Sequence, residues 1–131
     1  MEELYQMGIS TSTIKSMLEI NPNIQDMTSK EFLEKFLLLK DFNCNECQII
    51  NIVSSNPMFL DRTNEKIIEL ANELVNLGFD CLNVLFDSNP YILNLEVFEI
   101  KKYISNRKSH GERLDEIVDD LDSHPYLFHE I

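Results

Sequence analysis

The sequence predicts an all-α fold: a right- or left-handed solenoid of about three and a half helical repeats of about 34 residues, each with two helices and a proline-containing turn. Two observations lead to this prediction. The four prolines are spaced by 35, 33 and 35 residues, and they follow Asn21, Asn56, Asn89 and His124. Apolar residues recur at fixed distances from these prolines, with the i, i+4 spacing of a helix face. A repeat of this period indicates helix pairs that bury their apolar faces by stacking.

The recurrent apolar positions define the expected core. They lie eight and four residues before each proline, two residues after it, and ten and fourteen residues after the first three. Agreement at five offsets is improbable by chance. We therefore expect burial at Ile14, Leu18, Phe32, Ile49, Val53, Ile67, Leu82, Phe86 and Ile100.

The first helix of each unit is expected to begin at a capping residue and to end before the proline. The expected caps are Ser10, Asn43 with Glu46 three residues later, and Asp80. The Asn-Pro pair ends the helix, because the residue before a proline is pushed out of the α region and asparagine tolerates a left-handed turn.

The second helix of each unit is expected after the turn. The expected caps are Thr28 with Glu31, Thr63 and Asn94, and the expected ends are near Lys40, at Gly78 and near Asn106. A glycine just past a helix end relieves left-handed strain, which suits Gly8, Gly78 and Gly111. The first six residues are predicted to be the last turns of a preceding second helix.

These elements predict one helical-repeat domain over residues 1–131. Its units are roughly 1–8 (partial), 9–42, 43–78, 79–110 and 111–131 (a partial unit or cap). The last unit has the character of a cap, since its helix, expected over 112–122, carries Asp119 and Asp120, and acidic side chains keep the outer face of an array in water.

The composition is that of one folded domain. Apolar residues make up 44% of the 131 residues and charged residues 26%, which can support a packed core and argues against a disordered chain. No apolar run approaches the ~20 residues of a membrane span, and the acidic N-terminus is unlike a signal or transit peptide. Three cysteines indicate a reducing compartment. We expect an intracellular protein, in the cytoplasm if prokaryotic or in an organelle matrix if the chain is a trimmed eukaryotic one.

One basic segment interrupts an acidic chain whose formal charge is −12. Residues 101–111 hold Lys101, Lys102, Arg107 and Lys108 with no acid, and Arg113 follows. Three interpretations are open: basic residues favoured by a helix C-terminus, a patch that contacts phosphates, or side chains paired with the acids that follow and masked until a partner arrives.

Other chemical motifs are weak. Cys44-x-x-Cys47 has half of a zinc spacing and no second pair, and the repeat places Cys44 in the core and Cys47 at the surface. His124 occupies the position of a helix-ending asparagine, and Asp119 and Asp120 are expected to be solvated. No catalytic motif is present, so we expect no enzyme activity, no metal and no cofactor.

Two stretches carry a family resemblance. Leu4-Tyr5-Gln6-Met7-Gly8 runs on to Asn21-Pro22-Asn23-Ile24, and Leu74-Val75-Asn76-Leu77-Gly78-Phe79 runs on to Asn89-Pro90-Tyr91-Ile92-Leu93. The pattern resembles the mitochondrial transcription termination factor (mTERF) family. The resemblance implies a helical solenoid that binds double-stranded DNA or RNA and acts in transcription termination, ribosome assembly or organelle gene expression. The chain departs from the family in being short, in its acidic charge and in showing no targeting peptide.

Two functions are therefore expected as alternatives. In the first, the chain binds nucleic acid and regulates or terminates transcription, with phosphate contacts from Lys101, Lys102, Arg107, Lys108 and Arg113. In the second, it is a protein-interaction solenoid whose acidic surface binds a basic protein or peptide and has no nucleic-acid role. Neither involves a membrane.

Overall fold

The computed structural model describes all 131 residues, and it contains helices and turns but no strand, which confirms the all-α class. The elements, in chain order, are α1 (Glu2–Gln6), α2 (Thr11–Ile20), η1 (Pro22–Asp26), α3 (Ser29–Asp41), α4 (Glu46–Ser55), η2 (Pro57–Asp61), α5 (Asn64–Leu77), α6 (Leu82–Ser88), η3 (Pro90–Asn94), α7 (Val97–Ser109), α8 (Leu114–Ser123) and η4 (Pro125–Glu130), where η denotes a 3₁₀-helix.

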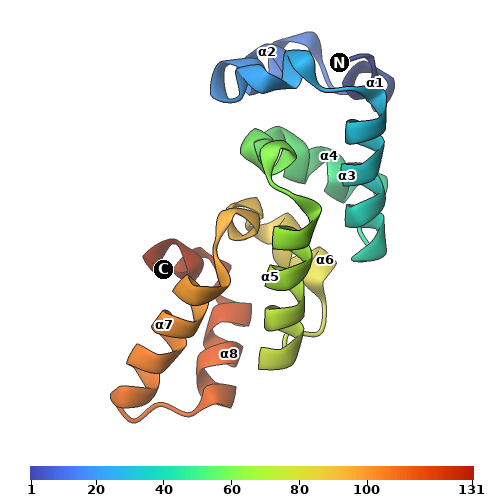
Figure 1. The fold of residues 1–131 in the computed structure, drawn as a ribbon. Helices are drawn as coiled ribbons and strands as arrows, with labels where there is room; N and C mark the ends of the chain where they lie inside the picture. The colour runs from blue at the N-terminus through green and yellow to red at the C-terminus, as the bar shows by residue number, and fades with distance from the viewer.

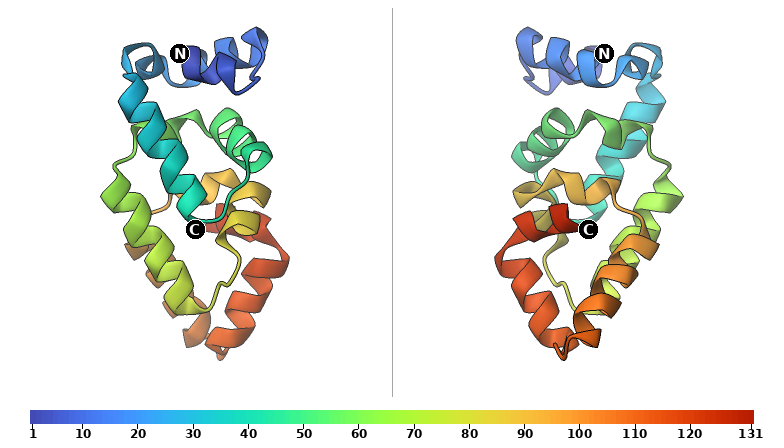
Figure 2. Two further views of the ribbon diagram at one scale, coloured as in Figure 1. Left: turned by 90° about the vertical axis from the view of Figure 1, so that its right-hand side faces the viewer. Right: turned by 90° about the vertical axis from the view of Figure 1, so that its left-hand side faces the viewer.

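The helices form a stack of similar units. Each complete unit has a first helix (α2, α4 or α6), a 3₁₀-turn and a second helix (α3, α5 or α7), and α8 with η4 begins a further unit. First helices pack on first helices and α5 packs on α7, so the units step along one axis (Figure 1). Figure 2 shows the first and second helices as two separate sides of the stack. No helix has both the length and the apolar character needed to cross a bilayer.

All four prolines lie just after a first helix, as predicted. The first helices end at Ile20, Ser55, Ser88 and Ser123, and each proline opens the 3₁₀-helix that follows. Proline suits this position because its missing N–H would have no partner in the first turn of a helix. The proline therefore both stops one helix and starts the next.

Most of the predicted core is buried. Seven of the nine expected residues are at most 1% exposed, and they belong to one continuous apolar cluster. Leu18 and Leu82 are partly buried and pack against this cluster without belonging to it. In α2 the inward position is taken by Met17 instead, and Leu82 is the first residue of the short helix α6 and lies at the edge of the core.

Three predicted caps were wrong. Asn43 is not a cap, because it adopts a left-handed backbone (φ +69°), and α4 begins at Glu46. Its cap is Asn45, which exchanges hydrogen bonds of 2.8 and 2.9 Å with Gln48. α6 follows Cys81 rather than Asp80, with no side-chain cap. α7 follows Glu96, whose backbone N–H donates to Glu99 at 2.9 Å, and not Asn94.

The remaining boundaries agree closely with expectation. Ser10, Thr28 and Thr63 each cap a helix through their side-chain oxygens. α3 ends at Asp41, and α5 ends at Leu77 with Gly78 left-handed, whereas α7 runs three residues beyond Asn106. All three glycines have positive φ, as their place past a helix end predicted. The longer α7 brings most of the basic segment onto one helix.

Candidate nucleic-acid interface

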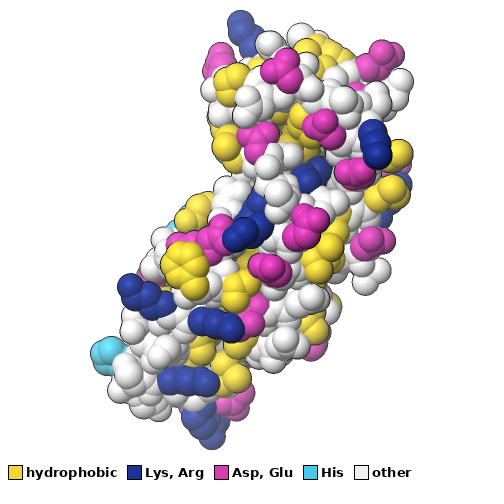
Figure 3. Space-filling view, in the orientation of Figure 1, with side chains coloured by type: hydrophobic (Ala, Val, Ile, Leu, Met, Phe, Trp, Pro, Cys, Tyr) yellow, Lys and Arg dark blue, Asp and Glu magenta, His cyan; other side chains and the backbone are white.

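The predicted basic residues lie on α7 and at the start of α8. Lys101, Lys102, Arg107 and Lys108 belong to α7, and Arg113 precedes the first residue of α8. Lys and Arg side chains gather over α7 at the lower left of Figure 3. Helix periodicity nevertheless points these side chains in different directions, so their surroundings differ.

Lys101 and Lys108 line one hollow between α5 and α7. They are two helical turns apart, and Ile104 and Ser105 lie between them on the same face of α7. Glu73 and Leu77 of α5 form the opposite wall, and the hollow measures about 280 Å³. Both lysines are exposed and neither forms an ion pair, so two ammonium groups face water from one groove.

Lys102 lies around the helix from that pair. It lines a different hollow with Phe98, Asn106 and Glu130, beside the 3₁₀-helix η4. The fold therefore does not gather all five predicted residues into one site, and it leaves Lys102 exposed at the flank of the groove.

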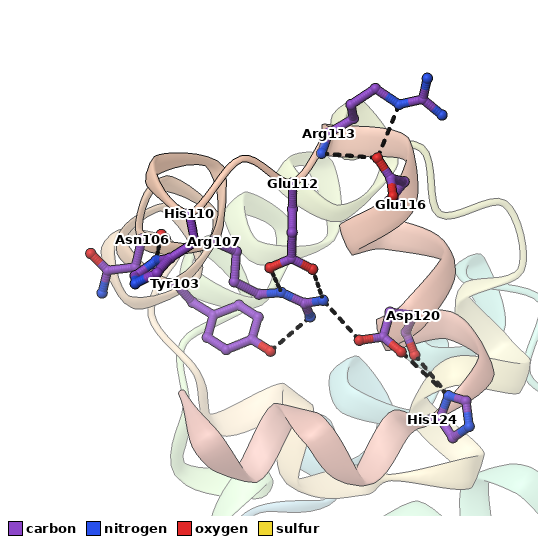
Figure 4. Close-up of polar contacts among 9 residues, drawn as sticks. All are labelled: Tyr103, Asn106, Arg107, His110, Glu112, Arg113, Glu116, Asp120 and His124. Atoms are coloured by element: carbon purple, nitrogen blue, oxygen red, sulfur yellow. Dashed lines mark hydrogen bonds and ion pairs between the residues drawn. The ribbon is translucent and has the colours of Figure 1, made fainter.

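Arg107 is held by one acidic partner from the turn after α7, Glu112, and one from α8, Asp120 (Figure 4). Its Nε donates to Glu112 at 2.8 Å, a terminal nitrogen donates to Asp120 at 2.9 Å, and the other donates to the Tyr103 hydroxyl at 3.0 Å. The hydrogen bond from Arg107 holds the pKa of Glu112 below its usual range. Only 19% of the Arg107 side chain is exposed, so the guanidinium braces the α7–α8 hairpin.

Arg113 is paired in a much looser way. Figure 4 shows its contact with Glu116, at 3.0 Å. It also contacts Asp115 at 3.3 Å, and 74% of its side chain is exposed. Exposed ion pairs of this kind contribute about 0–1 kcal/mol, because water screens them and side-chain entropy opposes them. The Arg113 guanidinium therefore remains open to exchange one anion for another.

One of the three interpretations of the basic segment thus applies to two of its five residues. Pairing with the following acids describes Arg107 and Arg113, while the lysines carry unpaired charge. Asp120 was expected to be solvated; its side chain is 40% exposed, but it also pairs with Arg107 and lies 3.6 Å from the His124 ring. Asp119 is exposed, as expected.

The other candidate residues have structural surroundings. Cys44 is buried and Cys47 exposed, as the repeat predicted. Burial, with a smaller effect from Asp87, raises the pKa of the Cys44 thiol to about 11. His124 closes α8, in the role expected of it. No three His, Cys, Asp or Glu side chains come together in a group fit to hold a metal ion.

The repeat register of the sequence carries a further signal for the basic site on α7. Lys101 and Lys102 stand eleven and twelve residues after Pro90, where the two earlier units carry Leu33-Glu34 and Ile68-Glu69. The repeat register alone thus identifies α7 as the unit in which an apolar-acidic pair becomes a basic pair. Arg107 is different: its position is occupied by the buried Leu39 and Leu74 in the earlier units, which agrees with its inward direction.

Stacked helix pairs joined by proline-initiated 3₁₀-turns define the chain as an α-helical repeat protein. Within that class, the model of the mTERF family matches residues 1–127, nearly the whole chain, and the protein belongs to the mTERF family. This is a family of nucleic-acid-binding helical-repeat proteins, as the sequence resemblance implied. Comparison with curated proteins and with solved structures finds no match.

Proposed function

We propose that the protein binds duplex nucleic acid through its sugar-phosphate backbone along α7, and that this binding serves the regulation or termination of transcription. The observation that carries the proposal is the unpaired state of Lys101, Lys102 and Lys108, on a helix whose neighbours are acidic. Ammonium groups without an internal partner release counterions when they meet phosphates, which is the main source of duplex affinity.

The spacing of the lysines suits a backbone contact. Lys101 and Lys108 are separated by seven residues, about 10 Å along a helix axis. Duplex DNA carries one phosphate per 3.4 Å of axis on each strand, so the two ammonium groups reach different phosphates. Lys102 extends the contact to the other side of α7.

The two arginines take different parts in the proposal. Arg113 is exposed, and exchange of its carboxylate partners for a phosphate adds a fourth contact. Arg107 contacts phosphate only if Glu112 and Asp120 release it; in its paired state it positions α7 against α8. We assign binding and no catalytic activity to the chain, since no residue set with a catalytic arrangement emerged from its sequence.

Salt-dependent binding tests this proposal. Fluorescence anisotropy with a labelled duplex DNA and a duplex RNA measures affinity from low to physiological salt, for the wild type and for Lys101→Ala/Lys102→Ala/Lys108→Ala. Each lost phosphate contact lowers the slope of log affinity against log salt by about one, so the triple variant loses about 2–3 of the slope.

The matched control removes the same charge elsewhere. Lys15→Ala/Lys30→Ala/Lys40→Ala takes three exposed lysines from α2 and α3 of the first complete unit and leaves α7 intact. This variant is expected to keep the wild-type slope. Equal losses in the two triple variants, or no duplex binding by the wild type at low salt, contradict the proposal and favour the alternative of an acidic protein-interaction solenoid.

A further inference from the structure

We propose that the second-helix side of the first two units docks a basic amphipathic helix of a partner protein, at a surface separate from the α7 lysines. The surface consists of Leu33 and Leu37 on α3 and Ile68 and Val75 on α5, and we call it the apolar surface. Hydrophobic side chains are exposed over α3 and α5 in Figure 3.

A groove beside α1 adjoins this surface and is lined by Leu33 and Leu37. It holds about 300 Å³ and lies between α1, α3 and α4. Six apolar side chains line it: Met7, Leu33, Phe36, Leu37, Ile49 and Ile50. A volume of this size accepts one or two large apolar side chains from a partner. The groove can therefore hold apolar side chains of a partner, which a flat apolar patch cannot do.

The groove and the lysine-lined hollow occupy equivalent places in the repeat. Leu33, Leu37 and Lys40 stand eleven, fifteen and eighteen residues after Pro22, and Lys101, Ser105 and Lys108 stand at the same distances from Pro90. Each set lines the space between its second helix and the one before it. One side of the solenoid therefore changes from apolar at its N-terminal end to basic at its C-terminal end.

The exposure of the apolar surface is high for side chains of this kind. Leu33 is 55% exposed, Leu37 49% and Val75 54%. Leu33 and Leu37 are one turn apart on α3, and Ile68 occupies the position of Leu33 in the next unit. Apolar ridges on two neighbouring helices, with a groove at one end, fit the i, i+3/i+4, i+7 anchors of an amphipathic helix. Clustered exposure of this kind marks interaction sites on folded proteins.

The charged residues around the apolar surface determine which kind of partner helix it binds. Glu34 and Glu69 directly follow Leu33 and Ile68, and Glu46 lines the groove. All three are exposed, and none takes part in an ion pair. Lys40 is the single cation that lines the groove. Unpaired carboxylates around an apolar surface attract a helix with lysine or arginine beside its apolar stripe, and they repel nucleic acid.

A designed peptide probes this surface directly. The probe is a fluorescein-labelled helix of about 14 residues, four turns long, with leucine on one face and lysine on the other. We expect saturable one-to-one binding, and we expect the amide resonances of α1, α3 and α5 to shift in ¹H–¹⁵N spectra. A serine-lysine peptide of equal charge and a leucine-glutamate peptide of equal apolarity are both expected to bind about tenfold more weakly, because each lacks one half of the match.

Two variants locate the binding on the protein. Leu33→Gln/Leu37→Gln keeps the helix propensity of α3 and is expected to weaken peptide binding by about tenfold. Its matched control is Val84→Gln/Phe98→Gln, which changes two exposed apolar residues on α6 and α7 and leaves binding unchanged. Glu34→Lys/Glu69→Lys alters only exposed charge, does not disturb packing, and is also expected to weaken binding.

Three results overturn the proposal. The first is binding that the Leu33→Gln/Leu37→Gln variant retains, and the second is resonance shifts confined to α7 or to the first helices. The third is self-association of the wild type that Leu33→Gln/Leu37→Gln abolishes in sedimentation measurements, which would make this surface an interface between copies of the chain. Duplex binding is expected to be unchanged in the Leu33→Gln/Leu37→Gln variant. Failure of the proposed helix docking is therefore distinguishable from failure of the duplex binding proposed for α7.

Discussion

Asn56 donates its side-chain N–H to the carbonyl oxygen of Pro90 at 2.9 Å, and this bond joins the turn of one unit to the turn of the next. The same bond links Asn21 to Pro57 at 3.0 Å and Asn89 to Pro125 at 2.9 Å. All three asparagines are buried. The residue before each proline thus has two roles, since it ends its own helix and fastens the following unit. Buried carbonyl groups need such donors, because an unpaired one is costly.

Replacement of Asn56 by alanine is expected to destabilise the protein by about 1–3 kcal/mol, because it removes a buried side chain that donates to the partly buried Pro90 carbonyl and exchanges hydrogen bonds with Asn94. Urea unfolding followed by circular dichroism measures the change. Asn72→Ala, at an exposed position of α5, is the control and is expected to change stability by less than about 0.5 kcal/mol. Equal midpoints for the two variants would show that the inter-unit bond contributes nothing.

The loss of stability on truncating a core side chain is expected to depend on how deeply that side chain is buried, even for two residues of the same helix. Phe86 is fully buried and packs edge-on against Phe42, with ring centres 5.7 Å apart. Phe86→Ala is expected to cost about 3–5 kcal/mol, through lost burial and a residual cavity. Leu82→Ala on the same helix is expected to cost clearly less, because Leu82 is only half-buried. An equal fall in urea midpoint for Leu82→Ala and Phe86→Ala would contradict this expectation.

The repeat made most of this fold predictable, and helix starts were its weakest point. Proline dictates where a first helix stops, so all four stops followed from the sequence. A start depends on which residue first adopts helical angles, and several polar residues compete for that place. Asn43 instead takes a left-handed backbone, which moves the cap of α4 to Asn45. Asn94 is drawn into a reciprocal hydrogen bond with Asn56 of the unit before, which no local pattern indicates.

The site was predictable in position but not in pairing. Charge counting placed the basic residues on one segment, and the structure has four of them on α7. Which ones carry free charge depends on the turn between α7 and α8. That turn brings Glu112 and Asp120, five and thirteen residues after Arg107, onto the same guanidinium. A contact between residues on two helices depends on their crossing, which composition does not encode.

Thiol reactivity is expected to separate the three cysteines. Cys44 is buried and the pKa of its thiol is raised to about 11, whereas Cys47 and Cys81 are exposed. The thiolate is the reactive form, so Cys44 stays almost wholly protonated at pH 8. Mass spectrometry after a short iodoacetamide treatment is expected to find label on Cys47 and Cys81 and little on Cys44. Urea-unfolded protein is the control, and all three cysteines should label there. Rapid labelling of Cys44 in the folded protein would contradict its burial.

The ion pairs of Arg107 are expected to stabilise the α7–α8 hairpin in a pH-dependent way. Arg107→Ala removes the donor shared by Glu112, Asp120 and Tyr103, so at pH 7 it should lower the urea midpoint. Arg113→Ala is the matched control, since it removes an arginine whose ion pairs are exposed, and it should have a much smaller effect.

The direction of the pH effect follows from Glu112. Arg107 lowers the pKa of this carboxyl in the folded protein, so the stabilisation is complete above the unfolded pKa, about 4.5, and is lost as pH falls through the lower folded value. The difference in urea midpoint between wild type and Arg107→Ala should therefore narrow as pH falls from 6 to 3. The difference in urea midpoint between wild type and Arg113→Ala is expected to be small at pH 6 and to change little as the pH falls. A wild-type advantage over Arg107→Ala that persists undiminished at pH 3 would mean that Arg107 acts through its contacts with Tyr103, whose ring centre lies 5.6 Å from the guanidinium carbon, and not through its carboxylate partners.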